Sequence, residues 1–201
     1  MYKSLATGLI VALTMTSLAA AQTTPRQQSG EFETTIEQKV RMKYLLYLPA
    51  FYERQDAWPL LVFLHGAGER GDDLQQVKVH GPPKLIEQGK SLPMIVISPQ
   101  CQRRQMWHPD AVAHLVDEIC GKYKVDRQRM YLTGLSMGGF GTWNLAMAYP
   151  ERFAAIAPIC GGGDARDVAR IKEIPIWAFH GAKDNAVPVE MTQKMIDALR
   201  S

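Results

Sequence analysis

A serine flanked by glycines is the pattern in this chain that most clearly indicates chemistry. The segment Gly134-Leu135-Ser136-Met137-Gly138 has G-x-S-x-G spacing and directly follows the strand-like run 129–133. A serine at so sharp a strand-to-helix turn has a strained backbone and needs small residues two positions before and after it. The helix expected over 137–148 points its N-terminus at Ser136, where free N–H groups favour negative charge. The spacing therefore predicts a serine nucleophile for acyl transfer.

The elements that position this serine follow from alternating apolar runs and helical patterns. We expect strands over 32–36, 40–48, 59–64, 94–98, 129–133, 154–159 and 175–179, and helices over 82–89, 111–124, 137–148 and 190–200. The alternation predicts an α/β fold with a mostly parallel sheet, in which the first two strands form an antiparallel pair. Right-handed crossovers bring the loops that follow the parallel strands to one edge of the sheet. Ser136 and the segments 65–66, 99–100, 161–163 and 180–181 are expected to meet there.

The first residues indicate export. Lys3, the apolar stretch 5–18 and the alanines 19–21 form a signal-peptide pattern, with cleavage expected after Ala21. The expected location is outside the cell or in the periplasm, with no stable membrane insertion after cleavage. Residues 22–30 are expected to be a flexible lead-in, and 31–201 one domain. The net charge of +3 is too small to predict a nucleic-acid partner.

Three cysteines, Cys101, Cys120 and Cys160, have spacings that match no metal motif. We therefore expect neither a metal nor an organic cofactor. One disulfide with one free thiol, or three unpaired thiols, are both open at this point. The oligomeric state is not indicated by any feature.

Four segments carry a resemblance to the α/β-hydrolase superfamily. They are Leu64-His65-Gly66-Ala67-Gly68-Glu69-Arg70-Gly71-Asp72, Gly134-Leu135-Ser136-Met137-Gly138-Gly139, Pro158-Ile159-Cys160-Gly161-Gly162 and His180-Gly181-Ala182-Lys183-Asp184. Within the superfamily, the chain is similar to the small, often secreted esterases grouped with feruloyl esterases, polyhydroxybutyrate depolymerases, phospholipase/carboxylesterases and predicted peptidases. The resemblance covers roughly residues 32–201 and implies a three-layer α/β-hydrolase sandwich.

The resemblance also implies roles for individual residues. Ser136 is the nucleophile, and the backbone N–H groups of Met137 and Ala67 form the oxyanion hole. Asp184 is the acid of the triad, with Asp164 as the fallback. His65 is expected to hold its loop, and the charged run 69–73 is expected to fix the same loop through ion pairs.

The sequence departs from the family pattern because it lacks a histidine at the expected position of the catalytic base. The superfamily order is serine, then acid, then histidine, yet no histidine follows His180, and Ser201 lies only 17 residues after Asp184. We interpret the sequence as truncated at the C-terminus, lacking the last strand, the last helix and the base. Two alternatives stay open: a substitute base, for which His108 is the best candidate, and a catalytically dead protein.

These observations predict a secreted serine hydrolase that cleaves carboxylic esters through an acyl-enzyme. Residues 161–174 are too few for a helical cap, so the substrate can be bulky or linked to a polymer. A serine peptidase of the same fold is one alternative. The other is a non-catalytic scaffold that binds a polymer or carbohydrate, although Trp143 and Trp177 are expected to pack in the core rather than face a ligand.

Overall fold

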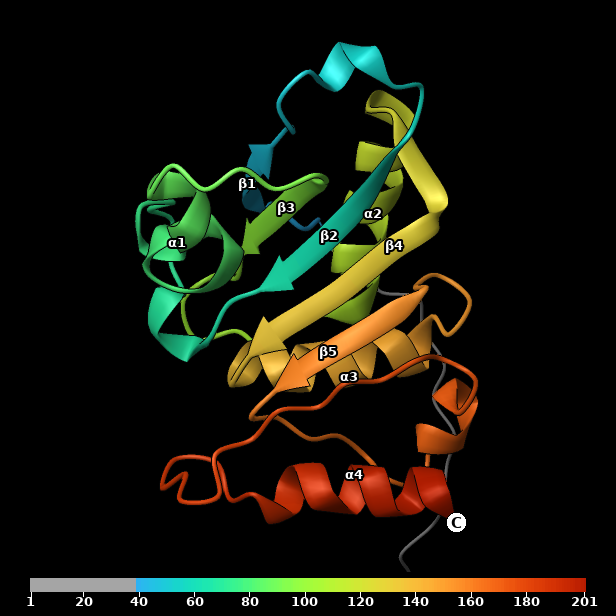
Figure 1. Cartoon of the computed structure of the whole chain (residues 1–201). Helices are drawn as coiled ribbons and strands as arrows, with labels where there is room; N and C mark the ends of the chain where they lie inside the picture. Colours follow the sequence, from blue (N-terminus) through green and yellow to red (C-terminus); the bar gives the residue numbers. More distant parts are fainter. Residues whose placement is uncertain (1–38) are drawn as a thin grey trace, which may run out of the picture. The chain divides into compact units, whose positions relative to one another are not determined.

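The computed structural model describes residues 39–201, which hold five strands and four α-helices (Figure 1). The predicted signal peptide, the lead-in and the expected strand 32–36 lie outside the described residues. The strands are β1 Lys43–Tyr47, β2 Trp58–Leu64, β3 Ile95–Gln100, β4 Val125–Leu135 and β5 Ala155–Ile159. The α-helices are α1 Gly81–Glu87, α2 Pro109–Lys122, α3 Met137–Ala148 and α4 Glu190–Arg200. Short 3₁₀ helices are η1 Tyr52–Arg54, η2 Ala67–Glu69, η3 Gln76–Val79 and η4 Val168–Ile171.

The sheet has the strand order β1-β3-β2-β4-β5. β1 is antiparallel to β3, and every other pair is parallel, which confirms the predicted mostly parallel sheet. The expected strand 175–179 is only partly formed. It continues the sheet beside β5 through two isolated parallel bridges, Ile156–Ile176 and Ile159–Phe179.

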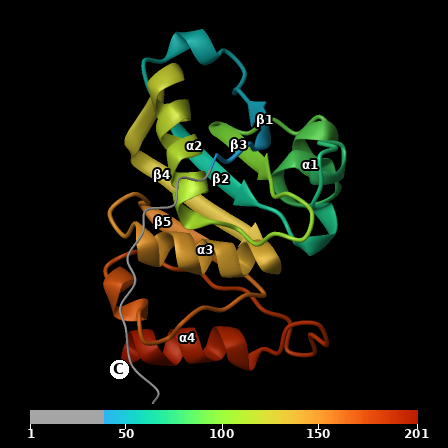
Figure 2. The ribbon, with the colours of Figure 1, turned by 180° about the vertical axis from the view of Figure 1, so that it is seen from behind.

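The main core lies between the sheet and two helices. Figure 2 shows α2 and α3 in front of the sheet, and Figure 1 shows them behind it, so both cover the same face. The alternate strand residues on this face are apolar and at most 2% exposed: Leu60, Val62, Leu64, Ile95, Ile97, Leu132 and Ile156. Trp143 of α3 is fully buried, as expected.

The opposite face of the sheet is covered unevenly. Gly81 begins α1 at φ 62°, and a Cβ atom there would lie 2.5 Å from the ring of Phe63, so only glycine lets α1 approach. Further along, Leu61, Tyr131 and Trp177 line an open apolar cavity of about 360 Å³. Trp177 is 72% exposed, so the prediction of a core position for it was wrong. Successive residues of an extended chain point to opposite sides of a sheet. The side chain of Trp177, in the segment at the sheet edge, projects toward the face that none of the helices α2–α4 covers.

All three cysteines are free thiols, so no disulfide forms. Among residues 39–201, no helix is both long and apolar enough to cross a bilayer. Over the same range, no three His, Cys, Asp or Glu side chains gather closely enough to hold a metal ion.

Three glycines let the start of α3 press directly against the ends of the neighbouring strands. A Cβ atom on Gly134 or Gly138 would overlap the carbonyl oxygen of Leu64, and one on Gly139 would overlap that of Ile159. The contacts are with backbone atoms, which cannot rotate away as a flexible side chain can. The glycines are therefore required by packing around the turn, beyond the conformation of the turn itself.

We predict that Gly138→Ala destabilises the fold by about 3 kcal/mol or more, because the added methyl must displace the end of β2. Gly121→Ala is the matched control, since a Cβ atom there has no neighbour within 4 Å and the residue lies in α2. We expect it to be neutral or to stabilise the fold by about 0.5–1 kcal/mol. Urea unfolding of both variants measures the difference, and equal unfolding midpoints would contradict the packing argument.

Candidate active site

Ser136 occupies the sharp turn between β4 and α3. Its backbone has φ 56° and ψ −116°, a conformation that costs a non-glycine residue about 1–3 kcal/mol. Two hydrogen bonds hold the turn: Ser136 N–H donates to the Ile159 carbonyl (2.9 Å), and Phe140 N–H donates to the Ser136 carbonyl (3.0 Å). The residue is partly exposed at the N-terminus of α3, so its hydroxyl lies where the amides of the helix start are also found.

Strand register brings the loop after β2 next to this serine. Leu64 pairs with Gly134 in the parallel β2–β4 ladder, so Gly66 and Ser136 both lie two residues beyond the paired positions. A Cβ atom on Gly66 would lie 3.7 Å from the Cβ of Ser136 and 3.2 Å from Oε2 of Glu69. A side chain at position 66 would therefore stand between the loop and the serine.

Both predicted oxyanion donors are the first residues of helices. Met137 begins α3, and Ala67 begins η2 and is exposed. The first N–H groups of a helix have no partner within the helix, so both amides are available to a ligand. With Gly66 against Ser136, the two helix starts border the same space. An arrangement of this kind stabilises a developing alkoxide.

His65 holds the loop of Ala67 and is itself completely buried. Cys101 N–H donates to its Nε2 (3.0 Å), so the proton lies on Nδ1, which donates to the Gly66 carbonyl (2.6 Å). The indole N–H of Trp107 donates to the His65 carbonyl (3.1 Å). Burial is the largest influence on the imidazole and lowers the pKa of His65. The expectation that His65 fixes its loop is confirmed.

The charged run 69–73 was expected to fix its loop through ion pairs, and the contacts in the structure differ from that expectation. Arg70 donates to two backbone carbonyls, those of Ala67 (2.9 Å) and Gln105 (3.2 Å). Glu69 is buried, with its carboxylate 3.6 Å from Nε2 of His80 and 3.7 Å from Nδ1 of His65. The run 69–73 is thus held mainly by hydrogen bonds to backbone and not by ion pairs among its own charges.

Asp184 lies in the turn that follows the segment 175–179. Its Oδ1 accepts the N–H groups of Ala186 (2.9 Å) and Val187 (3.0 Å), and these backbone hydrogen bonds lower the pKa of Asp184. The carboxylate is therefore ionised at neutral pH. Its Oδ2 lies 3.7 Å from Nε2 of His180.

His180 anchors the Asp184 turn to α4. Its Nδ1 lies 2.7 Å from Oγ1 of Thr192, which donates to the Gly161 carbonyl (2.5 Å), and its Nε2 lies 2.8 Å from the Val187 carbonyl. Both ring nitrogens are occupied, so neither is free to take a proton from Ser136. The sequence had no signal for Thr192, which is a lone hydroxyl on an amphipathic helix.

The remaining candidates form no hydrogen bond with Ser136 among the described residues. Asp164 is paired with Arg166 through both carboxylate oxygens, and the Arg166 guanidinium lowers the pKa of Asp164 to about 2. His108 is exposed ahead of α2, with Nδ1 3.8 Å from Asp110, and His114 is exposed on α2. Within residues 39–201, no hydrogen bond joins a histidine to Ser136.

Several known proteins resemble this chain in sequence. The family profile described as "Putative esterase" matches residues 96–187, a range that contains Ser136 and Asp184. A bifunctional acetylxylan esterase/xylanase of Neocallimastix patriciarum is 25% identical over 154 residues, which cover 71% of this chain and 22% of that protein. Poly(3-hydroxyalkanoate) depolymerase C of Paucimonas lemoignei is 42% identical over 52 residues, covering 26% of this chain and 13% of the depolymerase. The chain therefore spans about a fifth or less of the length of these curated relatives.

Solved structures share the fold. A thermostable esterase aligns with a TM-score of 0.70 and 37% identity over 80% of this chain and 48% of that one. A ferulic acid esterase aligns with a TM-score of 0.60 and 18% identity over 79% of each chain. The chain is similar to esterases in sequence, and it shares the α/β-hydrolase fold with solved esterase structures. This confirms the resemblance and the predicted α/β-hydrolase fold.

The buried imidazole gives the fold a dependence on pH. Because the folded pKa of His65 lies below the unfolded value of 6.5, the native state binds fewer protons than the unfolded state in the interval between the two. Stability should therefore fall as pH drops from about 7 to about 5.5. Urea unfolding midpoints at the two pH values measure the loss.

His65→Gln should show a smaller loss over the same interval, and His114→Gln, which removes an exposed histidine, should lose as much stability as the unmodified protein. An undiminished loss in His65→Gln would contradict the assignment.

Proposed function

We propose that the protein is a serine esterase that cleaves carboxylic esters through an acyl-enzyme on Ser136. The observation that carries the proposal is the strained turn of Ser136 at the start of α3, directly beside the loop of Gly66 and Ala67. Strain of this kind persists only where the surrounding structure imposes it, and it is concentrated at functional sites. Similarity to esterases supports the same activity. Export from the cell remains a prediction.

In the proposed mechanism, Oγ of Ser136 attacks the ester carbonyl, whose oxygen becomes an alkoxide between the amides of Ala67 and Met137. The alcohol leaves, and water then attacks the acyl-enzyme. Asp184, kept ionised by two backbone N–H groups, orients and compensates the positive imidazole that carries the proton. That imidazole follows the acid in α/β-hydrolases, and residues 185–201 contain no histidine. Free imidazole serves as the base in the experiments below.

The proposed substrate is an ester carried on a bulky or polymeric molecule. Ser136 is partly exposed, and the segment 161–174 contains only the short η4 helix, so no cap covers the site from there. The acetylxylan esterase and the poly(3-hydroxyalkanoate) depolymerase are named for esters of polymers. An ester leaving group also needs less protonation than an amide, so ester and anilide derivatives of one acid separate an esterase from a peptidase.

The first prediction for the site is covalent labelling. A fluorophosphonate probe should modify the protein, and the rate should rise with added imidazole, which replaces the base. Ser136→Ala should abolish labelling, whereas Ser201→Ala, which removes an exposed serine at the end of α4, should leave it unchanged. Mass spectrometry of the labelled peptide gives the position. Labelling that persists in Ser136→Ala, or none at all with imidazole present, would contradict the esterase and favour a non-catalytic scaffold.

The second prediction concerns the oxyanion donor on the loop. Ala67→Pro removes the N–H group, and proline is well tolerated at the first position of a helix. The preceding Gly66 is already extended, at φ −78° and ψ −177°, as a residue before proline prefers. The imidazole-assisted acylation rate with p-nitrophenyl acetate should fall by about 10²–10³.

Gly68→Ala is the control, because a Cβ atom there meets nothing within 4 Å. It should leave the acylation rate within about twofold, a change small beside the loss of a donor. An unchanged rate in Ala67→Pro, with its unfolding midpoint preserved, would remove Ala67 from the mechanism.

A further inference from the structure

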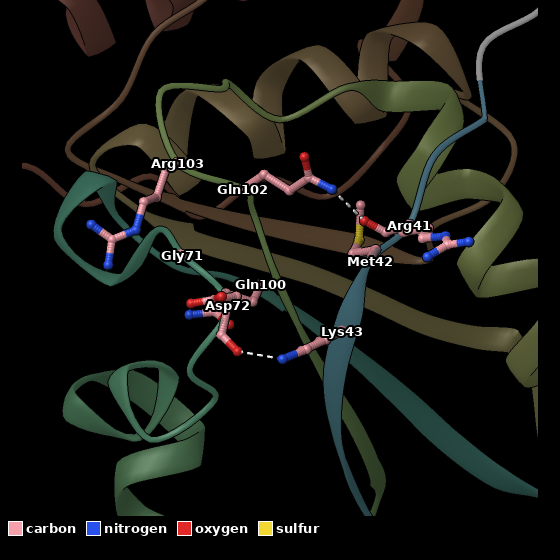
Figure 3. Close-up of a pocket in the computed structure, with 8 residues that line it drawn as sticks. All are labelled: Arg41, Met42, Lys43, Gly71, Asp72, Gln100, Gln102 and Arg103. Carbon is pink, nitrogen blue, oxygen red and sulfur yellow. Dashed lines mark hydrogen bonds between the residues drawn. The ribbon is translucent and has the colours of Figure 1, made fainter.

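A cavity of about 410 Å³ lies two to three strands away from Ser136, on the same edge of the sheet. Three segments line it: the entry to β1, the loop after η2, and the end of β3 with the residues that follow (Figure 3). β1 is antiparallel to β3, so its entry lies beside the exit of β3, where Lys43 pairs with Gln100. Gly71 N–H donates to the Cys101 carbonyl (2.9 Å) and ties the other two segments together.

Cationic side chains come from two of the three segments. Arg41 and Lys43 belong to the β1 side and Arg103 to the β3 side. Lys43 Nζ donates to the main-chain carbonyl of Asp72 (2.5 Å), not to its carboxylate. Among residues 39–201, no carboxylate lies within 4.0 Å of any of these three cations. The cavity therefore presents positive charge that an anionic ligand can neutralise.

Gln100 is a buried amide that fixes the loop on one side of the cavity. The residue is 2% exposed, and its Nε2 donates to the carbonyls of Glu69 (2.9 Å) and Asp73 (2.8 Å). This fixes the amide orientation, because the reverse would set Oε1 against two carbonyl oxygens. Oε1 is buried with no partner among the described residues, and such a group costs about 1–3 kcal/mol.

The lining next to Gln100 carries both signs of charge. Gly71 has φ 152°, and a Cβ atom there would lie 3.7 Å from Nε2 of Gln100 and 3.9 Å from Nε of Arg103. The missing side chain keeps the guanidinium close to the buried amide. The exposed carboxylate of Asp72 is a further acceptor, and Met42 adds an apolar wall. A ligand must therefore supply an anionic group, hydroxyl donors and some carbon surface.

We propose that this cavity binds a sugar acid, a hydroxylated carboxylate such as a uronic acid. Its carboxylate would pair with Arg103, since guanidinium and carboxylate form two parallel hydrogen bonds. Its hydroxyls would donate to the exposed carboxylate of Asp72, and its ring carbons would contact Met42. Inorganic phosphate would also pair with the cations, but it places more negative charge beside the carboxylate of Asp72 and offers few hydrogen-bond donors. A neutral sugar leaves the cations unpaired.

The proposed site is separate from the proposed reaction. Neighbouring strands are about 4.8 Å apart, so the cavity lies roughly 10–15 Å from Ser136. A sugar acid in the cavity does not touch the serine, and its binding needs neither Ser136 nor a base. The sugar-acid proposal would therefore remain valid if the esterase proposal failed, and the esterase proposal would remain valid if the cavity bound no sugar acid.

The test is calorimetric titration of the 201-residue protein with D-glucuronate, D-glucose and inorganic phosphate at low salt. We expect saturable binding of glucuronate with Kd at or below about 1 mM, the range for a few charge-assisted hydrogen bonds. Glucose and phosphate should each bind at least about tenfold more weakly, which is the loss of one such interaction.

Arg103→Gln should weaken glucuronate binding at least about tenfold, while the neighbouring Arg104→Gln, outside the cavity lining, should change it by less than about twofold. The unfolding midpoint checks that both variants fold. Two results of the titration would overturn the proposal. One is phosphate binding as tight as glucuronate binding, which would make the cavity a general anion site, and the other is no saturable binding of glucuronate. Equal effects of the two arginine variants would do the same.

Discussion

The backbone contact between the start of α3 and the ends of β2 and β5 is the constraint on which the rest of the structure depends. Gly138 and Gly139 leave no space for a Cβ atom between the helix and the carbonyls of Leu64 and Ile159. With the helix seated so closely, Ser136 must turn through a left-handed conformation to join β4 to α3. The same seating sets the first amides of α3 beside the loop of Gly66. The reactive geometry is therefore a consequence of how backbone packs on backbone.

Hydrogen bonds to backbone, more than ion pairs, hold the loops around this serine. His65 joins Gly66 to Cys101, Arg70 joins two carbonyls, and His180 joins the Asp184 turn to α4 through Thr192. Such bonds fix direction as well as distance, which oxyanion donors and an orienting carboxylate both require. They also set charge: burial lowers the pKa of His65, and backbone N–H groups lower that of Asp184. The candidate site thus combines a neutral imidazole in the loop of Ala67 with an ionised carboxylate in the turn of Asp184.

One loop serves both the serine and the proposed sugar-acid cavity. The chain from His65 to Asp72 begins against Ser136 and ends in the wall of the cavity. Gln100 binds the carbonyl of Glu69 within this chain and that of Asp73 directly after it. A substrate held at both places would span neighbouring strands along one edge of the sheet. This arrangement fits the proposal of a polymeric ester, because the part of the molecule that is recognised and the bond that is cleaved can be well separated.

Local patterns in the chain were sufficient to predict much of the fold. Glycine spacing around Ser136, apolar runs of strand length and helical periodicity predicted β2 to β5, the four α-helices and the sharp turn at Ser136, since these signals lie within a few residues of one another. Trp177 was misplaced because its environment depends on which helices cover the sheet, and no pattern within 175–179 records that. The ion pairs expected within 69–73 failed for a similar reason: Arg70 found carbonyls that only the folded loop presents.

The sequence by itself determined the fold class and predicted the serine and the acid, because each is written in a contiguous motif whose residue types permit few other conformations. Only the tertiary structure decided that His180 is fully engaged by Thr192 and Val187, that Glu69 and Gln100 are buried, and that Arg41, Lys43 and Arg103 surround one cavity. These relations join residues many positions apart, through strand register and loop closure. Neither the spacing nor the composition of any single segment specifies them.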